Sequence, residues 1–358
     1  MKCFGVVMAG GGGTRFWPLS RQSLPKQMLN LTGNDLMINE AVDRLNRMVH
    51  KEDIFIVTSA LQAEAIAQAT DERVQRDHIL AEPSARNTAA CIGYAAIEIL
   101  EKYGDGVMII TPSDHYIQDV DALTRTFEKA VEAAEKENKL VTIGIKPTFP
   151  STGFGYIKQK ANDAIPVKEV LEFKEKPDAE TAQKYIASGE YVWNSGMFVW
   201  KASVILEQFQ KHIPDIYEDI RKIGAALNTP EEQGTIQSVY SEIRRISVDY
   251  AILEPASRLG DVLVVAGDFP WSDIGSWDMM DQLHEPDQNN NILIGDTLAL
   301  QTKGCVCYST KKLIATYDVE NLVVVETDDA ILVCSRESVQ QVREIVLKLE
   351  EAGRSELL

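Results

Sequence analysis

Residues 3–20, CFGVVMAGGGGTRFWPLS, join an apolar segment to four consecutive glycines. The apolar run over residues 3–9 predicts a buried β-strand. Glycines that follow a strand let backbone N–H groups point at a phosphate without obstruction by side chains. We therefore interpret the segment after the strand as a phosphate-binding loop, made by Gly10, Gly11, Gly12, Gly13 and Thr14.

Two common glycine loops do not match this segment. A P-loop ends in Gly-Lys-Ser or Gly-Lys-Thr, and a dinucleotide-binding loop needs a third glycine where Arg15 stands. The next predicted strand, residues 54–58, ends in Thr58 and is followed by Ser59 rather than by an acidic residue that could bind a ribose. A nicotinamide-dependent enzyme is therefore the weaker interpretation.

The start of the chain is basic although the chain as a whole is acidic. The first 30 residues contain Lys2, Arg15, Arg21 and Lys26 and no Asp or Glu, whereas the formal net charge of all 358 residues is -18. Local cations beside the glycines support an anion-binding site. The overall negative charge argues against nucleic acid and anionic membranes as partners.

The first half of the chain alternates apolar runs with helical periodicity, and its length corresponds to about two domains. Strands are predicted over residues 3–9, 54–58, 107–111 and 140–145. Helices are predicted between them, over residues 39–49, 62–70, 88–101 and 122–137. This order predicts an α/β fold with a parallel sheet, helices on both faces, and ligands at the carboxyl ends of the strands.

A second domain is expected after the turn-rich segment 285–291, EPDQNNN. We predict a catalytic domain over residues 1–285 and a small β-rich domain over residues 286–358. A short parallel β-helix, of the left-handed kind, is one candidate architecture for its strands, predicted at residues 298–300, 306–308, 313–316, 322–325 and 331–334. The apolar stripe of residues 339–349 predicts an amphipathic helix that packs on this domain or on another subunit.

The cysteines and the apolar segments indicate a cytoplasmic protein. The five cysteines are odd in number and form no C-x-x-C pair, as expected for reduced thiols, and we interpret Cys305 and Cys307 as core residues. No apolar run reaches the roughly 18 residues of a membrane span, and the first run is too short for a signal peptide.

The loop followed by Leu24-Pro25-Lys26-Gln27 resembles the signature of nucleotide-sugar pyrophosphorylases. Five later motifs are similar in order and spacing to mannose-1-phosphate guanylyltransferases: EPSARNTA at 82–89, PSDH at 112–115, FKEKP at 173–177, WNSGMF at 193–198 and WSDIGSW at 271–277. The resemblance spans the whole chain. It implies a Rossmann-like, mixed but mainly parallel sheet with a β-rich C-terminal domain.

The resemblance also implies a reaction, in which GTP and mannose 1-phosphate give GDP-mannose and pyrophosphate with the help of Mg²⁺. The nucleophile comes with the substrate, because a phosphate monoester has a second pKa near 6 and is already anionic at pH 7. This agrees with the lack of a catalytic triad or a Cys-His pair in the sequence. Cations must then position and stabilise the phosphates.

The resemblance assigns these roles residue by residue. Arg15 would face the departing pyrophosphate, and Lys26 the phosphates near the reacting centre. Asp114 and Asp273 each follow a predicted strand and would share one Mg²⁺, although either aspartate alone is as well explained as a helix cap or turn residue.

Two further groups would bind the rest of the substrates. The sugar phosphate would contact Gly155, Glu175, Lys176, Asn194 and Ser195, and the last two could instead satisfy neighbouring backbone. The nucleotide would contact Glu82, Pro83, Arg86, Asn87 and Thr88. Which of them touches guanine stays open, because Glu82 could instead stay in solvent or pair with Arg86.

Other functions remain as alternatives. The same machinery could act on another sugar 1-phosphate or another base, and a non-catalytic nucleotide-sugar sensor subunit could keep the pocket. Some longer relatives carry a phosphomannose isomerase module after the transferase, whereas this chain stops after its terminal helix, so isomerase activity is not expected. The apolar faces of the C-terminal region lead us to expect a homodimer.

Overall fold

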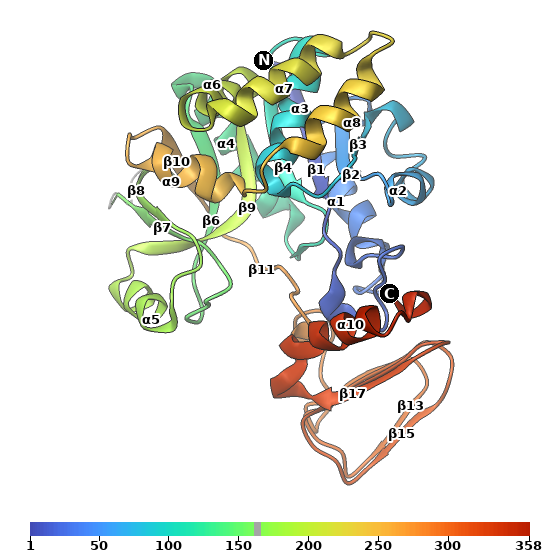
Figure 1. Cartoon of the computed structure of the whole chain (residues 1–358). Helices are drawn as coiled ribbons and strands as arrows, with labels where there is room; N and C mark the ends of the chain where they lie inside the picture. The colour runs from blue at the N-terminus through green and yellow to red at the C-terminus, as the bar shows by residue number, and fades with distance from the viewer. Residues whose placement is uncertain (161–165) are drawn as a thin grey trace. The chain divides into compact units, whose positions relative to one another are not determined.

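The computed structural model describes residues 1–160 and 166–358 (Figure 1). The chain forms two compact units. The first unit comprises residues 1–10, 41–113 and 117–270, and the second comprises residues 11–40, 114–116 and 271–358. The units therefore interleave along the chain, and the domain boundary near residue 285 stays a prediction.

The first unit is built on a nine-stranded sheet with the strand order β3-β2-β1-β4-β9-β6-β10-β8-β7. Its strands are β1 (Cys3–Ala9), β2 (Ile54–Ser59), β3 (Ile79–Glu82), β4 (Val107–Pro112), β6 (Leu140–Ile145), β7 (Tyr156–Gln159), β8 (Val167–Lys174), β9 (Tyr191–Lys201) and β10 (Val262–Gly267). The four strands predicted in the first half of the chain are confirmed.

The sheet is mixed because β9 and β8 each run antiparallel to both of their neighbours in the strand order. Strand β1 pairs in parallel with β2 and β4, and β6 pairs in parallel with β10. Strand β9 lies between β4 and β6 and is antiparallel to both. Alternation of strands and helices predicts that neighbouring strands are parallel. This prediction does not apply to β9, because β9 comes from the later segment in which the alternation has ended.

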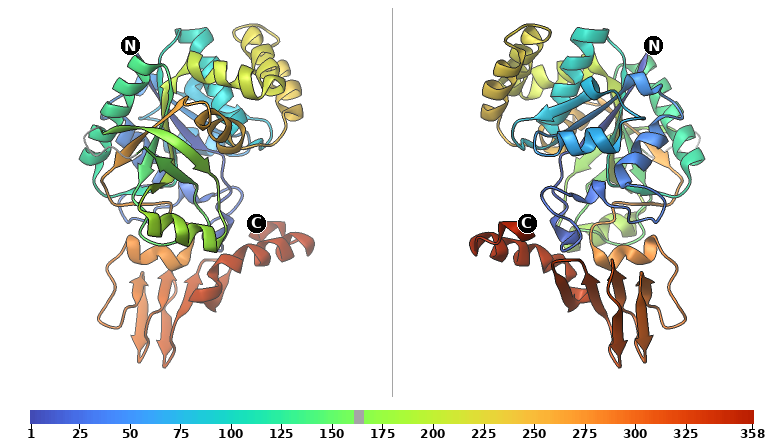
Figure 2. Two further views of the ribbon diagram at one scale, coloured as in Figure 1. Left: turned by 90° about the vertical axis from the view of Figure 1, so that its left-hand side faces the viewer. Right: turned by 90° about the vertical axis from the view of Figure 1, so that its right-hand side faces the viewer.

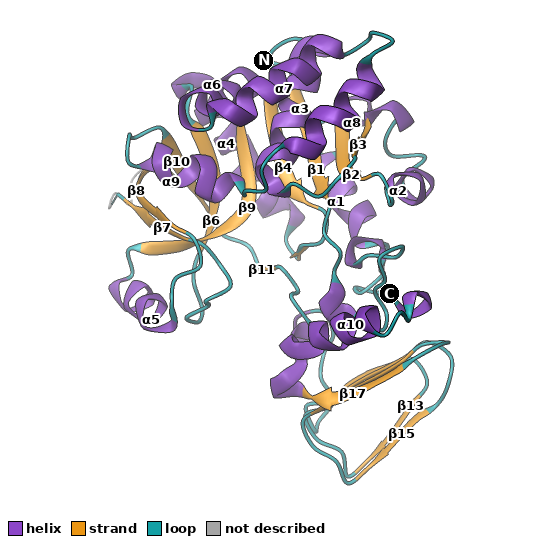
Figure 3. Cartoon of the chain, viewed as in Figure 1, coloured by secondary structure: helices purple, strands orange, loops and turns teal. Residues whose placement is uncertain are grey.

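Helices cover both faces of the sheet (Figure 3). Those of the first unit are α2 (Ala63–Ala69), α3 (Asn87–Tyr103), α4 (Val120–Glu137), α5 (Ala179–Ser188), α6 (Ala202–His212), α7 (Pro214–Ala226), α8 (Glu232–Glu242) and α9 (Glu254–Ser257), while α1 (Met37–Leu45) continues from the second unit into the first. Helices α3, α6 and α7 pack together, and α4 packs on β4, β6, β9 and β10. The four predicted helices are confirmed.

Helix α3 is the most buried of these helices. It carries Ala89, Ile92, Ala96 and Ile99 at helical spacing, and these side chains lie in the same apolar core as Phe4 of β1. Its small residues allow close packing on the neighbouring helices. Helix α3 is thereby held against β1 and β2 of the sheet.

The C-terminal part of the second unit is a small parallel β structure (Figure 2). Strands β12 (Ile292–Ile294), β14 (Val306–Ser309) and β16 (Leu322–Glu326) pair in parallel, and β17 (Ile331–Ser335) closes that sheet in the antiparallel sense. Strands β13 (Thr297–Leu300) and β15 (Ile314–Tyr317) form a second, parallel pair. The predicted β-rich region is confirmed.

The amphipathic helix at the end of the chain packs within its own unit. It is observed as the 3₁₀ segment η7 (Arg336–Gln341) followed by α10 (Val342–Glu351). Val342 is buried in a core that also contains Phe16, Trp17 and Trp277. The indole N–H of Trp277 donates to the carbonyl of Trp17 at 3.2 Å. The sequence left open whether this helix packs on its own domain or on another subunit, and its buried residues pack within the second unit.

The cysteines are unpaired, as predicted. Cys305 and Cys307 are buried in the β structure and form a small apolar core with Ile314. Within the two described ranges, no helix combines the length and apolar character that crossing a membrane requires.

Glu326, at the end of β16, makes the stability of the second unit dependent on pH. Its carboxylate accepts hydrogen bonds from the backbone N–H groups of Lys311, Thr310 and Lys312, at 3.0, 3.0 and 3.2 Å. These hydrogen bonds, with that of Lys311 the strongest, lower the pKa of Glu326 to about 2. The carboxylate therefore stabilises the fold above pH 4.5, and this contribution is lost as the pH falls toward 2.

We expect Glu326→Gln to lower the urea midpoint near pH 7 and to flatten its pH dependence between about pH 4.5 and 2, because the amide cannot titrate. The measurement is urea unfolding followed by circular dichroism across this pH range. Glu320→Gln is the matched control, because Glu320 is exposed and pairs with Lys303 at 3.4 Å. Equal pH dependence in the wild type and Glu326→Gln would refute the role of these hydrogen bonds.

Candidate functional site

The glycine loop is fastened to the segment that carries Lys26. Gly13 has a φ of +59°, and a Cβ added there would lie 2.5 Å from the Cβ of Lys26 and 2.7 Å from its backbone nitrogen. Only glycine fits this contact. The side chain of Gln27 donates to the carbonyl of Gly11 at 3.2 Å, so the 3₁₀ turn η2 (Lys26–Met28) supports the loop from a second point.

Lys26 brings the two predicted metal ligands together. Its side chain is buried, and Nζ donates to Asp114 twice, to the carbonyl oxygen at 2.8 Å and to Oδ2 at 3.0 Å. The same ammonium donates to the carbonyl oxygen of Asp273 at 2.6 Å. Residues from three distant parts of the sequence thus meet around one positive charge, and a solvated surface lysine is excluded.

The two carboxylates are in different electrostatic states. Burial opposes the ionisation of Asp114, but the charges of Lys26 and His115 outweigh it and lower the pKa of Asp114. Burial also opposes the ionisation of Asp273, and the negative charge of Asp114 adds to it, so the pKa of Asp273 is raised although Lys26 and Arg15 act against this. Asp273 thus lacks a sufficient positive partner.

The chemistry of this pair fits a divalent cation. Oδ1 of Asp273 is buried and has no hydrogen-bond partner among the residues that the structure describes. An unpaired buried oxygen is costly, and a cation held with Asp114 would satisfy it. Oxygen ligands from a few carboxylates, completed by phosphate oxygens and water, suit Mg²⁺.

Arg15 lies in the same group, and a glutamine from the end of the chain holds it. Nη1 of Arg15 donates to Oε1 of Gln340 at 3.3 Å, and the amide of Gln340 donates to the hydroxyl of Ser276. A Cβ added at Gly275 would lie 3.4 Å from Nη1 of Arg15 and 3.6 Å from Oδ2 of Asp273. Gln340 therefore connects the glycine loop with the Asp273 turn. No sequence signal marks it, since 325 residues separate it from Arg15.

The predicted nucleotide-binding residues of the first unit gather around the end of β3. Glu82 is buried and accepts a hydrogen bond from the hydroxyl of Tyr240 on α8. Burial raises the pKa of Glu82, and the Tyr240 hydrogen bond partly offsets this. A Cβ added at Gly10 would lie 3.1 Å from Oε2 of Glu82, so the backbone of Gly10 is in close contact with this carboxylate.

Arg86 does not pair with Glu82. Its Nε donates to the hydroxyl of Ser84 at 3.0 Å, and its Nη2 donates to the carbonyl of Ser241. Glu82 instead has Tyr240 as its partner, which the sequence could not reveal because 158 residues lie between them. The partner of Glu82, Tyr240, and the partner of Arg86, Ser241, both lie in α8, so α8 orients this loop.

Asn87 and Thr88 start helix α3. Asn87 has a φ of +68°, and its side-chain oxygen accepts from the N–H of Thr88 at 2.8 Å. The hydroxyl of Thr88 accepts from the N–H of Val248 at 2.9 Å. Thr88 therefore holds the segment that leads into the π-helix η5 (Asp249–Leu253).

Three predicted sugar-phosphate residues touch one another in the first unit. A Cβ added at Gly155 would lie 2.4 Å from Oε2 of Glu175 and 3.2 Å from the Cβ of Asn194. The N–H of Asn194 donates to the carbonyl of Gly155 at 2.8 Å. The ammonium of Lys176 pairs with Oε1 of Glu175, while Oε2 is buried without a hydrogen-bond partner in the described part of the chain.

Ser195 is used inside the sheet. Its side chain is buried, its hydroxyl donates to the carbonyl of Ile143 at 2.7 Å, and it accepts from the N–H of Met197 at 3.2 Å. Satisfaction of neighbouring backbone was the alternative that the sequence left open for this residue. Ser195 is therefore absent from the group formed by Gly155, Glu175 and Asn194.

Asp249 joins this group and was missed by the sequence analysis. The amide nitrogen of Asn194 donates to Oδ1 of Asp249 at 2.9 Å. Burial, and next the charge of Glu175, raise the pKa of Asp249 to about 6, although Lys176 acts in the opposite direction. No motif marked Asp249, because it lies in a π-helix remote in sequence from the strands it approaches.

The raised pKa of Asp249 should make the stability of the fold depend on pH. Because the pKa of 3.8 in the unfolded chain is lower than the folded value of about 6, the folded state binds the proton more tightly. Stability must then fall as the pH rises from about 4 to about 6. Asp249→Asn keeps the acceptor for Asn194 but cannot ionise, so its stability does not fall in this way. The folding equilibrium constant of the variant, relative to that of the wild type, should therefore rise roughly tenfold or more over this pH range.

The measurement for Asp249→Asn is chemical unfolding at several pH values between about 3.5 and 7. Asp219→Asn on α7 is a suitable control, because that side chain pairs with Lys222 on the surface of the same unit. A difference between Asp249→Asn and the wild type that does not change with pH would show that Asp249 ionises normally.

Two families match the chain in sequence. The family described as "Nucleotidyl transferase" matches residues 4–290. The domain family described as "MannoseP isomerase/GMP-like beta-helix domain" matches residues 295–349, which include β13 to β17.

Named proteins are similar to nearly the whole of this chain. The chain is 40% identical over 352 residues to the xanthan biosynthesis protein XanB of Xanthomonas campestris pv. campestris strain B100, which covers 98% of this chain and 74% of the relative. It is 37% identical over 358 residues to a mannose-1-phosphate guanylyltransferase of Klebsiella pneumoniae, with coverage of 98% and 74%.

A solved structure agrees with these matches. The crystal structure described as a mannose-1-phosphate geranyltransferase from Thermus thermophilus superimposes with a TM-score of 0.88 at 33% identity, covering 98% of this chain and all of that one. The glycine loop, the Lys26 cluster and the mixed sheet are thus found in a chain that belongs to the nucleotidyl transferase family and continues into a β-helix domain of the mannose-phosphate isomerase/GMP-like type.

Proposed function

We propose that this protein forms GDP-mannose and pyrophosphate from GTP and mannose 1-phosphate. The observation that carries the proposal is the buried ammonium of Lys26, which gathers Asp114 and Asp273 beside the glycine loop. The substrates follow from the relatives, one of which is named a mannose-1-phosphate guanylyltransferase.

The nucleophile needs no base from the protein. A phosphate oxygen of mannose 1-phosphate, largely ionised at pH 7, attacks the α-phosphorus of GTP. The new bond forms as the bond from the α-phosphorus to the bridging oxygen breaks, and pyrophosphate leaves in line. The protein must therefore hold several anionic groups close together and neutralise the charge that develops on the leaving group.

Lys26 and Arg15 would supply the fixed positive charge. Lys26 is buried and held by three oxygens, so its position is set before the substrate binds. A charge that needs no reorganisation stabilises a transition state more effectively than a mobile one. Arg15 is exposed and held only by Gln340 among the contacts described for it, so its planar fork is able to follow the leaving pyrophosphate.

Asp114 and Asp273 would hold a divalent cation, for which we propose Mg²⁺. When bound there, the ion supplies charge neutralisation for phosphate oxygens and orients them. The unpaired buried oxygen of Asp273 is the feature of this chain that supports the assignment. The ammonium of Lys26 bonds a carboxylate oxygen of Asp114 and the backbone carbonyl of Asp273, and its charge favours the ionised form of both carboxylates.

The first unit would supply recognition of base and sugar. Glu82, oriented by Tyr240, offers an acceptor for the N–H groups of guanine. Glu175, with one oxygen unpaired, offers an acceptor for sugar hydroxyls, and Lys176 beside it offers a positive charge for the phosphate. Asn194 is oriented by Asp249.

Several finer assignments belong to the same proposal. We place the enzyme in the cytoplasm, as a homodimer, with a transferase domain that ends near residue 285. A pyrophosphorylase for another base or sugar 1-phosphate would use the same cluster. A non-catalytic sensor would need neither Lys26 nor the aspartate pair, and the close association of these three residues favours an enzyme.

The substrate assignment is tested by release of pyrophosphate with Mg²⁺ from GTP, ATP, dTTP and UTP, each combined with mannose 1-phosphate or glucose 1-phosphate. We expect release with GTP and mannose 1-phosphate and at least about tenfold less with every other pair. Release with a different pair would replace the substrates and keep the mechanism. Nucleotide binding without release in any combination would favour the sensor.

The metal assignment is tested with Asp273→Asn, which keeps the shape of the side chain and removes its charge. We expect turnover to fall about a hundredfold or more and the concentration of Mg²⁺ needed for half-maximal turnover to rise. Asp281→Asn is the matched control, because Asp281 is an exposed residue of the same unit that pairs with Arg336 at 2.8 Å. Wild-type Mg²⁺ dependence in Asp273→Asn would remove Asp273 from the site.

A further inference from the structure

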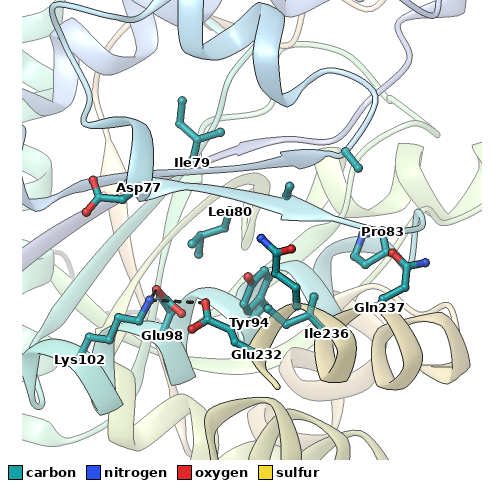
Figure 4. A pocket seen from close by; sticks show the side chains of 13 residues that line it. Asp77, Ile79, Leu80, Pro83, Tyr94, Glu98, Lys102, Glu232, Ile236 and Gln237 are labelled. Atoms are coloured by element: carbon teal, nitrogen blue, oxygen red, sulfur yellow. Dashed lines mark ion pairs between the residues drawn. The ribbon is translucent and has the colours of Figure 1, made fainter. Parts of the chain in front are cut away.

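A pocket of about 330 Å³ lies in the first unit between β3, α3 and α8 (Figure 4). Its walls include Leu80 from β3, Tyr94 and Glu98 from α3, and Glu232 and Ile236 from α8. None of the residues proposed above as catalytic or metal-binding lines it. Its volume is at the lower end of the range for small-molecule sites.

Glu98 is the unusual group in this pocket. Its side chain is 3% exposed, and Oε1 pairs with Nζ of Lys102, one turn further along α3, at 2.5 Å. Oε2 is buried and has no hydrogen-bond partner among residues 1–160 and 166–358. Figure 4 shows Glu98 and Lys102 facing the space in front of Leu80 and Tyr94. A buried carboxylate oxygen without a donor is rare, because it loses its water without compensation.

The charges around Glu98 leave the pocket negative. Asp77 and Glu232 line it together with Glu98, and Lys102 is the one basic side chain among the described residues that line it. Lys102 lies 3.9 Å from Glu232, so it is shared between two carboxylates. Burial, and to a smaller extent the charges of Glu232 and Asp77, raise the pKa of Glu98. A positive group placed here would lower this repulsion.

The rest of the lining is apolar. Leu80, Ile79, Ile236 and Pro83 present hydrocarbon to the space, and Leu80 and Ile236 are nearly buried. A bare metal ion would leave this apolar lining uncovered. An occupant needs a charged donor at one end and an apolar body at the other.

We propose that this pocket binds a small organic cation, a primary amine or guanidinium on a short hydrocarbon body, with the donor on Oε2 of Glu98 and the body against Leu80 and Ile236. The pocket adjoins the loop that the proposed function assigns to the nucleotide. Pro83 lines the pocket and follows Glu82, and Tyr240, which bonds Glu82, lies one turn after Ile236 on α8. An occupant would therefore contact both elements that orient the loop to which the proposed function assigns the base.

Binding is tested directly with phenethylamine as the probe and 2-phenylethanol as its neutral analogue. Titration of the full chain near pH 8, followed by ligand-observed NMR, should give saturable binding of the amine at submillimolar concentration, with the alcohol at least about tenfold weaker. Glu98→Gln should weaken amine binding about tenfold and bring the two probes closer together. Glu101→Gln, an exposed residue of α3 that pairs with Arg221, should leave both titrations unchanged.

A second variant keeps the proposal testable if Glu98→Gln does not fold. Ile236→Trp keeps Glu98 and fills the apolar end, so it should abolish binding of the amine while circular dichroism stays native. Absence of saturable binding to the wild type, or equal binding of amine and alcohol, overturns the proposal. Amine binding that survives both variants does the same, because the probe is then bound elsewhere. The titration needs no turnover, so its outcome is independent of the assay of the proposed reaction.

Discussion

The ammonium of Lys26 is the contact on which the organisation of the proposed catalytic centre depends. It is buried, and burial of a lone cation is tolerated only where oxygens replace its water. Three oxygens from Asp114 and Asp273 do so. Two of these oxygens are backbone carbonyls and one belongs to the Asp114 carboxylate. Lys26 therefore fixes the backbone at residues 114 and 273. The charge that we propose for binding the phosphates is thus also the charge that holds residues 114 and 273.

The glycine loop depends on the same segment for a steric reason. Gly13 lies so close to the backbone of Lys26 that a Cβ would overlap it, and Gln27 holds Gly11 from the neighbouring position. Gly11 and Gly12 are exposed, while Gly13 at the far end of the loop is anchored. Rigid support beneath an open loop is what binding of a polyanion by backbone requires.

The C-terminal part of the chain helps to position the glycine loop and Arg15. Phe16 and Trp17, directly after the loop, share a core with Val342 of α10 and Trp277. Gln340 then reaches Arg15 and Ser276 by hydrogen bonds. Apolar packing places the loop, and one amide sets the position of the arginine beside it. The side chain of Arg15 is otherwise exposed.

The sequence by itself determined the elements and indicated candidate residues for the site. Apolar periodicity marked β1, β2, β4 and β6 and the helices between them, because burial on one face or on both imposes a pattern that is local in the chain. The glycines and the early lysines and arginines stood out by their local pattern, whereas Asp114 and Asp273 were singled out by the family resemblance together with their place after predicted strands.

Only the tertiary structure decided which side chains meet. Nothing local indicates that β9 would enter the sheet between β4 and β6, that Tyr240 rather than Arg86 would bond Glu82, or that Asp249 would orient Asn194. The resemblance favoured a sugar as the partner of the Ser195 hydroxyl, and in the structure that hydroxyl donates to the carbonyl of Ile143. A hydrogen bond depends on distance and direction between groups, and those are set by packing of segments that lie far apart in the chain.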